Sequence, residues 1–228
     1  MDAPLRPLAP DLWVAERPFR ALPGLDIGTR MTVVRLPGGG VALHSPVEAD
    51  EATRKAVEAI GPVRAIACPN KLHHLFAGGW KLACPDARLL GAPGLPAKRR
   101  DLAFDGLLGD DPDPAWGEAL ATVHVRGIPI LEEIAFLHPA SRTLLLTDLA
   151  FHPTPASSAG LRRWTWISRV RGGFGPNAIV RLGIRDRDAL RRSLDHVLDW
   201  DFDRITVTHG EVLETGGRAA LRRAWEWL

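Results

Sequence analysis

A short apolar run that ends abruptly in polar residues constrains this chain more than any other part of its sequence. Residues 63–67 have the pattern of a buried strand, and residues 80–84 that of a helical turn. The loop between them contains two adjacent histidines, His73 and His74. In α/β proteins, polar residues between a strand and a helix lie at the carboxyl edge of a sheet, where ligands bind. Since imidazole binds metals and titrates near neutrality, the loop predicts a metal or proton-transfer site; the alternative is two histidines bonded only to nearby backbone.

The apolar periodicity predicts strands and helices in alternation. The expected strands are 12–15, 31–36, 41–44, 63–67, 88–92, 123–125, 128–137, 143–147 and 204–208. The expected helices are 50–60, 161–167, 185–200 and 216–228, and the Pro- and Gly-rich segment 18–30 is expected to be a loop. Two clusters of strands, each followed by helices, predict two sheets packed together with helices outside.

The composition is that of an ordinary globular chain. It has 228 residues, of which 46% are hydrophobic and 25% charged, and this is enough for one sizeable core. We therefore expect a single domain, 1–228, with a variable insertion near 93–119. A net charge of +2 gives no support for a nucleic-acid partner, and no apolar run approaches the roughly 20 residues of a membrane span. A small molecule is the expected partner, and the sequence carries no signal for an oligomeric state.

The chain has two cysteines, Cys68 and Cys84. Two are too few for a disulfide framework, and the sequence begins without a signal-peptide pattern, so we expect reduced thiols and a cytoplasmic protein. Cys68 adjoins the histidine loop. It is either a nucleophile with a histidine as its base or a small buried residue at the end of a strand.

Polar residues follow the predicted strands at four places, which are His44, the loop Asn70–His74, Asp148 and His209. Ligands taken from separate strand ends can be held rigidly by one scaffold. Imidazoles together with a carboxylate suit zinc, iron or manganese. A site with an open coordination position lowers the pKa of bound water to about 7, which prepares it for attack on an ester or amide. The alternative for each residue is an ordinary turn or cap role.

The order of these parts resembles the metallo-β-lactamase superfamily over roughly residues 12–228. The resemblance rests on the hairpin ending at His44, the histidine loop with Gly78 and Gly79, the hairpin 138–149 and the Thr-His-Gly at 208–210. The segments 29–36, 69–76 and 141–149 are similar to an uncharacterised branch of that superfamily. The resemblance implies an α/β fold, an αββα sandwich of two mixed β-sheets with outer helices. It also implies that Asp148 matches the metal-bridging Asp and that His209 matches the last His ligand.

The chain departs from the superfamily's first motif, His-x-His-x-Asp-His. Aligning the glycines puts His73 and His74 on the last two motif positions and Pro69 and Lys71 on the first two histidines. A shift by one residue puts Asn70 and Leu72 there instead, so neither register keeps the motif. The third-segment His falls near Pro129, with Glu132 and Glu133 close by, and His44 replaces an Asp. These losses speak against the superfamily's dinuclear zinc site.

We therefore expect a hydrolase of a small ester, amide or phosphoester with a rearranged site for one transition metal ion. Its ligands would come from His73 or His74, Asp148 and His209. Asp148 and His44 would be catalytic, with His44 moving the proton. Asn70 and Lys71 would bind the substrate. The alternative is a non-catalytic protein that has lost the metal and binds an anionic small ligand at the same sheet edge.

Overall fold

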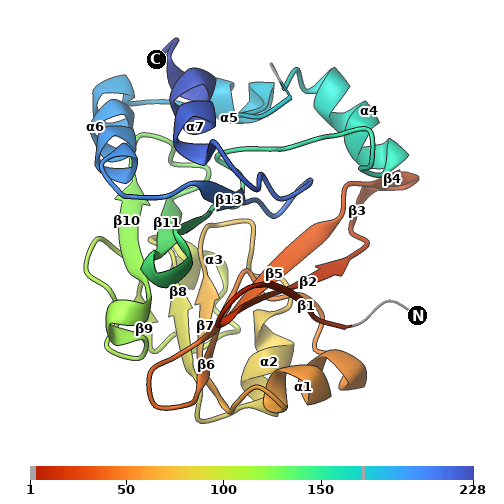
Figure 1. Cartoon of the computed structure of the whole chain (residues 1–228), viewed down its shortest axis with the longest axis vertical. Helices are drawn as coiled ribbons and strands as arrows, with labels where there is room; N and C mark the ends of the chain where they lie inside the picture. Colours follow the sequence, from red (N-terminus) through yellow and green to blue (C-terminus); the bar gives the residue numbers. More distant parts are fainter. Residues whose placement is uncertain (1–3, 171–172) are drawn as a thin grey trace.

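The chain folds into two mixed β-sheets packed face to face, with helices on both outer surfaces (Figure 1). The computed structural model describes residues 4–170 and 173–228. The first sheet has seven strands in the order β1-β2-β5-β6-β7-β8-β9, and the second has four in the order β10-β11-β12-β13. Helices α1 and α2 cover the first sheet, and α6 and α7 cover the second (Figure 1). The expected αββα sandwich is therefore confirmed.

The elements have the following bounds. The first sheet contains β1 (Arg6–Ala9), β2 (Leu12–Arg17), β5 (Thr29–Arg35), β6 (Val41–His44), β7 (Val63–Cys68), β8 (Arg88–Gly91) and β9 (Gly106–Leu107). The second contains β10 (Ala121–Val125), β11 (Glu133–His138), β12 (Thr143–Leu145) and β13 (Arg204–Thr206). The helices are α1 (Glu51–Glu58), α2 (Ala77–Ala83), α3 (Leu95–Lys98), α4 (Ala159–Ile167), α5 (Ala178–Leu182), α6 (Arg187–Leu198) and α7 (Gly217–Trp225). Among the described residues, no helix is long and apolar enough to cross a membrane.

Strand alternation divides the apolar side chains among three layers. In β7, Ala65 and Ala67 face the core between the sheets, whereas Ile66 and Cys68 face α1 and α2. In β11, Phe136 faces the core between the sheets and Leu137 faces α6 and α7. Successive side chains of a strand point to opposite faces, so a strand that is buried on both faces must be apolar on both. This explains the continuous apolar runs in the sequence.

The direction of strand pairing brings the polar strand ends together. In the first sheet, β6 pairs parallel to β7, so His44 and the loop after β7 lie at the same edge. In the second sheet, β12 pairs parallel to β13, so Asp148 and His209 also follow strands that end at one edge. Two backbone hydrogen bonds then join the two edges. Ile134 N–H donates to the Pro69 carbonyl at 2.8 Å, and Lys71 N–H donates to the Leu131 carbonyl at 2.8 Å.

Two of the expected elements were wrong in their extent. The expected strand 128–137 begins only at Glu133, because Pro129 lacks an N–H and Glu132 has φ 49°, which breaks an extended strand. The expected loop 18–30 contains a small hairpin, β3 (Arg20–Leu22) paired with β4 (Leu25–Asp26), and the first residues of β5. Segment 93–119, predicted to be a variable insertion, contains α3, β9 and a 3₁₀ turn, Gly117–Ala119.

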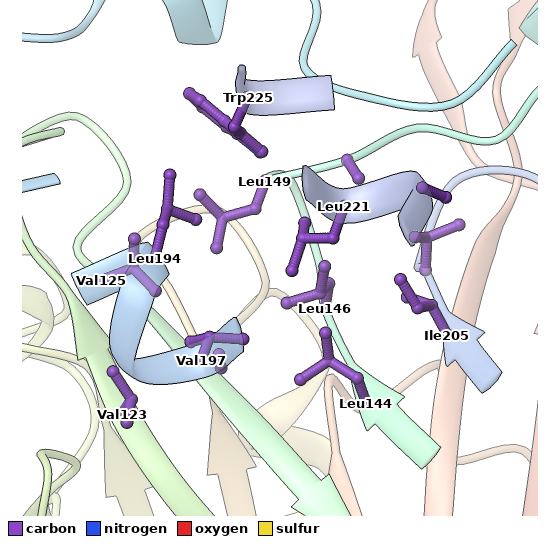
Figure 2. Close-up of a cluster of buried hydrophobic side chains, with 14 of the residues drawn as sticks. Val123, Val125, Leu144, Leu146, Leu149, Leu194, Val197, Ile205, Leu221 and Trp225 are labelled. Atoms are coloured by element: carbon purple, nitrogen blue, oxygen red, sulfur yellow. The ribbon is translucent and has the colours of Figure 1, made fainter. Parts of the chain in front are cut away.

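The outer core of the second sheet offers a test of the packing (Figure 2). Leu144 of β12 is fully buried among residues of α6 and α7, so Leu144→Ala is expected to lower the free energy of unfolding by about 2–5 kcal/mol. Leu82→Ala is the matched control, because Leu82 is 86% exposed, and we expect a change below about 0.5 kcal/mol. Urea unfolding measures both, and equal losses would contradict the assigned core.

Candidate metal centre

Three side chains from three separate strand ends meet at the shared edge of the sheets. His73 Nε2 lies 3.1 Å from Asp148 Oδ2, and His209 Nε2 lies 3.8 Å from Asp148 Oδ1. One ligand atom from each residue lies within 4.8 Å of the others. Tetrahedral nitrogen and oxygen ligands of zinc lie about 2.0–2.2 Å from the ion, so they are separated by roughly 3.3–3.6 Å. Small movements of the three side chains would therefore bring their ligand atoms to coordination distance from one ion.

Each imidazole is fixed by a partner at its other ring nitrogen. His73 Nδ1 is 3.0 Å from Ser45 Oγ, and His209 Nδ1 is 2.7 Å from the Gly28 carbonyl, to which it donates. Phe151 stacks on the ring of His209 at a centroid distance of 5.4 Å. Ser45 has φ 54°, a sparsely populated conformation that places its hydroxyl beside His73. Metal-binding histidines are oriented in this way through the nitrogen that does not face the ion.

A buried network of polar groups holds Asp148 in place. The Asn70 side-chain amide donates to Asp148 Oδ2 at 2.7 Å, to Thr147 Oγ1 at 2.9 Å and to Glu133 Oε2 at 3.1 Å. Glu133 in turn accepts three backbone N–H bonds from residues 147, 148 and 149, at 2.7, 2.8 and 3.2 Å. Asn70 and Glu133 are both fully buried. The network therefore joins the strand ends of the two sheets directly behind the three possible ligands.

The charges of the site favour ionised Asp148 and neutral His209. Burial opposes ionisation of Asp148, but His73, His209 and Asn70 outweigh it and lower its pKa to about 2. Burial, and then the neighbouring negative charge of Asp148, raise the pKa of Glu133. Burial, and then His73, lower the pKa of His209 to about 4, although Asp148 acts in the opposite direction. A carboxylate and a neutral imidazole are the protonation states that bind a metal ion.

A cavity of about 450 Å³ opens beside this group. His73, Asp148 and His209 form part of its wall, and most of the remaining wall is apolar. A concave, mostly apolar site with a few convergent polar groups is the usual form of a small-molecule site.

The chain was compared with protein-family models, with curated proteins and with solved structures. No protein-family model matches the chain, and no curated protein matches it in sequence. A metallo-β-lactamase of Erythrobacter litoralis, with β-mercaptoethanol in its active site, matches with TM-score 0.69 and 14% identity over 98% of this chain and 96% of that one. FIM-1 of Pseudomonas aeruginosa, in a mono-zinc form, matches with TM-score 0.66 and 13% identity over 99% and 96%. The chain has the metallo-β-lactamase fold.

Within the metallo-β-lactamase fold, this chain gathers only part of the expected donor set. The loop after β7 supplies one ligand atom, from His73, to the group found among the described residues. His74 is not part of that group, and its Nδ1 lies 2.8 Å from Arg99 Nη1. Burial, followed by Lys98 and Arg99, lowers the pKa of His74 to about 4. We therefore retain His73 and not His74 as the loop's candidate ligand.

His44 lies in the interior and not in the cavity wall. Its ring packs edge-on against Phe136 at a centroid distance of 4.8 Å. Within the described part of the chain, its Nε2 has no hydrogen-bond partner, and the cavity wall does not include it. Burial, followed by the proximity of His73, lowers its pKa to about 3. A proton carrier must reach the reacting group directly or through one water, so the expected shuttle role has no structural support.

The two residues expected to bind substrate are engaged with the protein itself. The Asn70 carbonyl oxygen accepts from the N–H groups of Leu72 and His73, both at 2.8 Å, and its amide is used in the network behind Asp148. Lys71 Nζ donates to the Pro129 carbonyl at 2.9 Å. The Asn70 side chain therefore holds Asp148, and Lys71 links the loop after β7 to the segment before β11.

Two further residues are explained by their surroundings. Cys68 is buried against α1 and α2, and burial raises the pKa of its thiol to about 12, which favours the packing role over the nucleophile. Glu132 Oε2 lies 2.7 Å from His124 Nε2, and neither residue belongs to the group of ligands.

Sequence reasoning placed Glu133 near the site but missed its supporting role. Its signal was a charged residue at the start of a strand that is apolar on both faces.

The buried network gives a stability prediction. Glu133→Ala would leave three backbone N–H groups without their acceptor and remove one of the acceptors of the Asn70 amide, and we expect a loss of about 3–5 kcal/mol in the free energy of unfolding. The adjacent Glu132→Ala, which removes one partly exposed ion pair, should cost no more than about 1 kcal/mol. Denaturant unfolding compares the two, and similar losses would argue against the network.

The buried imidazole of His44 predicts a pH effect on stability. Its folded pKa of about 3 lies below the ordinary value of 6.5, so the unfolded chain binds more protons and stability falls as pH drops below 6.5. Between about pH 7 and pH 5, His44→Leu should reduce this fall by about 2 kcal/mol relative to the unchanged protein. Urea unfolding with a chelator present measures it, and parallel pH profiles would contradict the prediction.

Proposed function

We propose that this protein is a hydrolase of a small ester, amide or phosphoester that uses one transition metal ion held by His73, Asp148 and His209. The observation that carries the proposal is the convergence of these three side chains, with ligand atoms within 4.8 Å of one another, on the wall of one cavity. Metallo-β-lactamases of the same fold, one of them in a mono-zinc form, support it by analogy.

The donor set fits such an ion. Two imidazoles and one carboxylate suit zinc, iron or manganese, and three protein ligands leave a position for water or substrate. Ser45 and Gly28 hold the two rings through their Nδ1 atoms, and Asn70 holds the carboxylate. The site is thus preorganised by groups that are themselves buried or bonded.

When bound, the ion would polarise the substrate's carbonyl or phosphoryl oxygen and lower the pKa of water. The chain's own contribution is to orient the substrate and to move a proton. Asp148 Oδ2 is engaged by His73 and Asn70, whereas Oδ1 lies 3.8 Å from His209, beyond hydrogen-bond distance. We assign to Oδ1 the acceptance of the proton from attacking water, which would pass to the leaving group as its bond breaks.

The contacts give less support to a non-catalytic protein that binds an anionic ligand. Such a ligand needs a cation in the cavity, and Lys98 of α3 is the only lysine or arginine among the described residues of the cavity wall. Lys71 donates to the Pro129 carbonyl, and Lys98 donates to the Lys71 carbonyl at 2.6 Å.

Cys68 and Cys84 are free thiols, which supports the further proposal of a cytoplasmic location.

Metal content tests the proposed function. Untagged protein purified without chelators should contain, or bind on titration, about one equivalent of zinc, iron or manganese per chain. Since loss of a group that only orients a ligand costs about 10–100-fold in affinity, His73→Ala, Asp148→Ala and His209→Ala should each cost at least that much. Elemental analysis and calorimetric titration provide the measurements.

Two histidine variants serve as matched controls. His74→Ala and His124→Ala remove imidazoles that lie outside the group, so both should keep the metal. Circular dichroism establishes that each variant is folded. Protein that takes up none of the three metals, or that loses metal equally in the control variants, would overturn the proposed site.

A further inference from the structure

Apolar side chains line both the interior and the mouth of the cavity beside the candidate metal centre. Inside, Ile27, Leu131, Phe151 and Val180 are buried and face the space. At its rim, apolar side chains remain exposed by 44–54%, namely Leu72, Leu75, Ile130 and Ile179. Exposed apolar side chains that gather at the mouth of a cavity mark a surface that a ligand or partner covers.

Two polar residues of the cavity wall, Asn177 and Lys98, donate or accept hydrogen bonds within the protein. Asn177 Oδ1 accepts from the Val180 N–H at 2.9 Å, which begins helix α5. Lys98, the only lysine or arginine among the described wall residues, donates through Nζ to the Lys71 carbonyl at 2.6 Å. A carboxylate or phosphate placed among the buried apolar side chains would lose its hydration without an ion partner beside it, and this is costly. An apolar ligand would gain about 0.8 kcal/mol for each methylene it buries.

We propose that the site takes an uncharged ester or amide whose acyl group is an alkyl chain of several carbons, with the chain in the cavity and the carbonyl at the metal centre. This inference rests on the proposed function and specifies its substrate class. Water adds to the acyl carbon, and the bond to the alkoxy or amino group breaks. The carboxylic acid and the alcohol or amine leave, the latter taking up the proton from water.

A series of esters tests chain-length preference. With zinc-loaded protein, kcat/KM should rise from p-nitrophenyl acetate through butyrate to hexanoate, by up to about fourfold for each methylene. The anionic p-nitrophenyl phosphate should react more slowly than hexanoate. A flat or falling series, or a preference for the phosphate ester, would overturn the proposal.

A charge at the mouth should remove the preference. Ile179 is half exposed on α5, so Ile179→Lys disturbs little packing, and it should lower the ratio of kcat/KM for hexanoate to that for acetate. Leu82→Lys, at an exposed position that is not part of the cavity wall, should leave the ratio unchanged. Equal ratios in both variants would contradict a role of this mouth in substrate binding.

A binding measurement separates this inference from the proposed function. In metal-free protein, bound Nile red should be displaced by 2-octanone at a much lower concentration than by 2-butanone, with a limit of about fourfold for each of the added methylenes. Displacement of this kind without any hydrolysis would overturn the hydrolase and support the apolar ligand class. If the esters are hydrolysed but neither their kcat/KM nor the displacement of Nile red depends on chain length, the apolar ligand class is overturned and the hydrolase is not.

Discussion

A fully buried carboxylate–amide contact joins the two sheets, and the candidate site depends on it. Asn70, from the end of β7, donates to Glu133 at the start of β11 and to Asp148 after β12. Glu133 also accepts the backbone N–H groups that follow β12. Buried polar groups are costly unless all are bonded, so this network specifies one relative position of the two sheets. Because Asp148 is a member of the network, the same contact that aligns the sheets also positions the central candidate ligand.

The fold and the site follow different constraints in this molecule. Apolar alternation, parallel strand pairs and outer helices reproduce the metallo-β-lactamase sandwich at 13–14% identity to the enzymes compared. At the sheet edge, the group of possible metal ligands among the described residues consists of His73, Asp148 and His209, and His44 is buried. A fold can be kept by any residues of suitable polarity and size, whereas coordination needs particular atoms at particular places. The function of such a chain therefore depends on the site and its cavity and not on the fold alone.

Much of the fold could be predicted, since strand and helix periodicity is local. The hairpin of β5 and β6, the strand β7 and the helix α6 all lie where apolar spacing predicts them. The start of β11 at Glu133 differs from the prediction, since the positive φ of Glu132 leaves no trace in the apolar pattern of the sequence. Asn70 and Lys71 were expected to bind substrate for a related reason. Their polar side chains look available in sequence, and only distant partners show that they are used internally.

The sequence by itself determined the layers of the sandwich and the candidate residues at its edge, because alternation and strand-end position depend on near neighbours in the chain. The tertiary structure alone decided which candidates meet. His73 and His74 are adjacent in sequence, yet one turns to Asp148 and the other to Arg99. The structure also decided the character of the cavity, whose walls come from β3, the loop after β7 and helix α5. These segments are far apart in the chain, and only the packing of the two sheets sets the distances between their side chains.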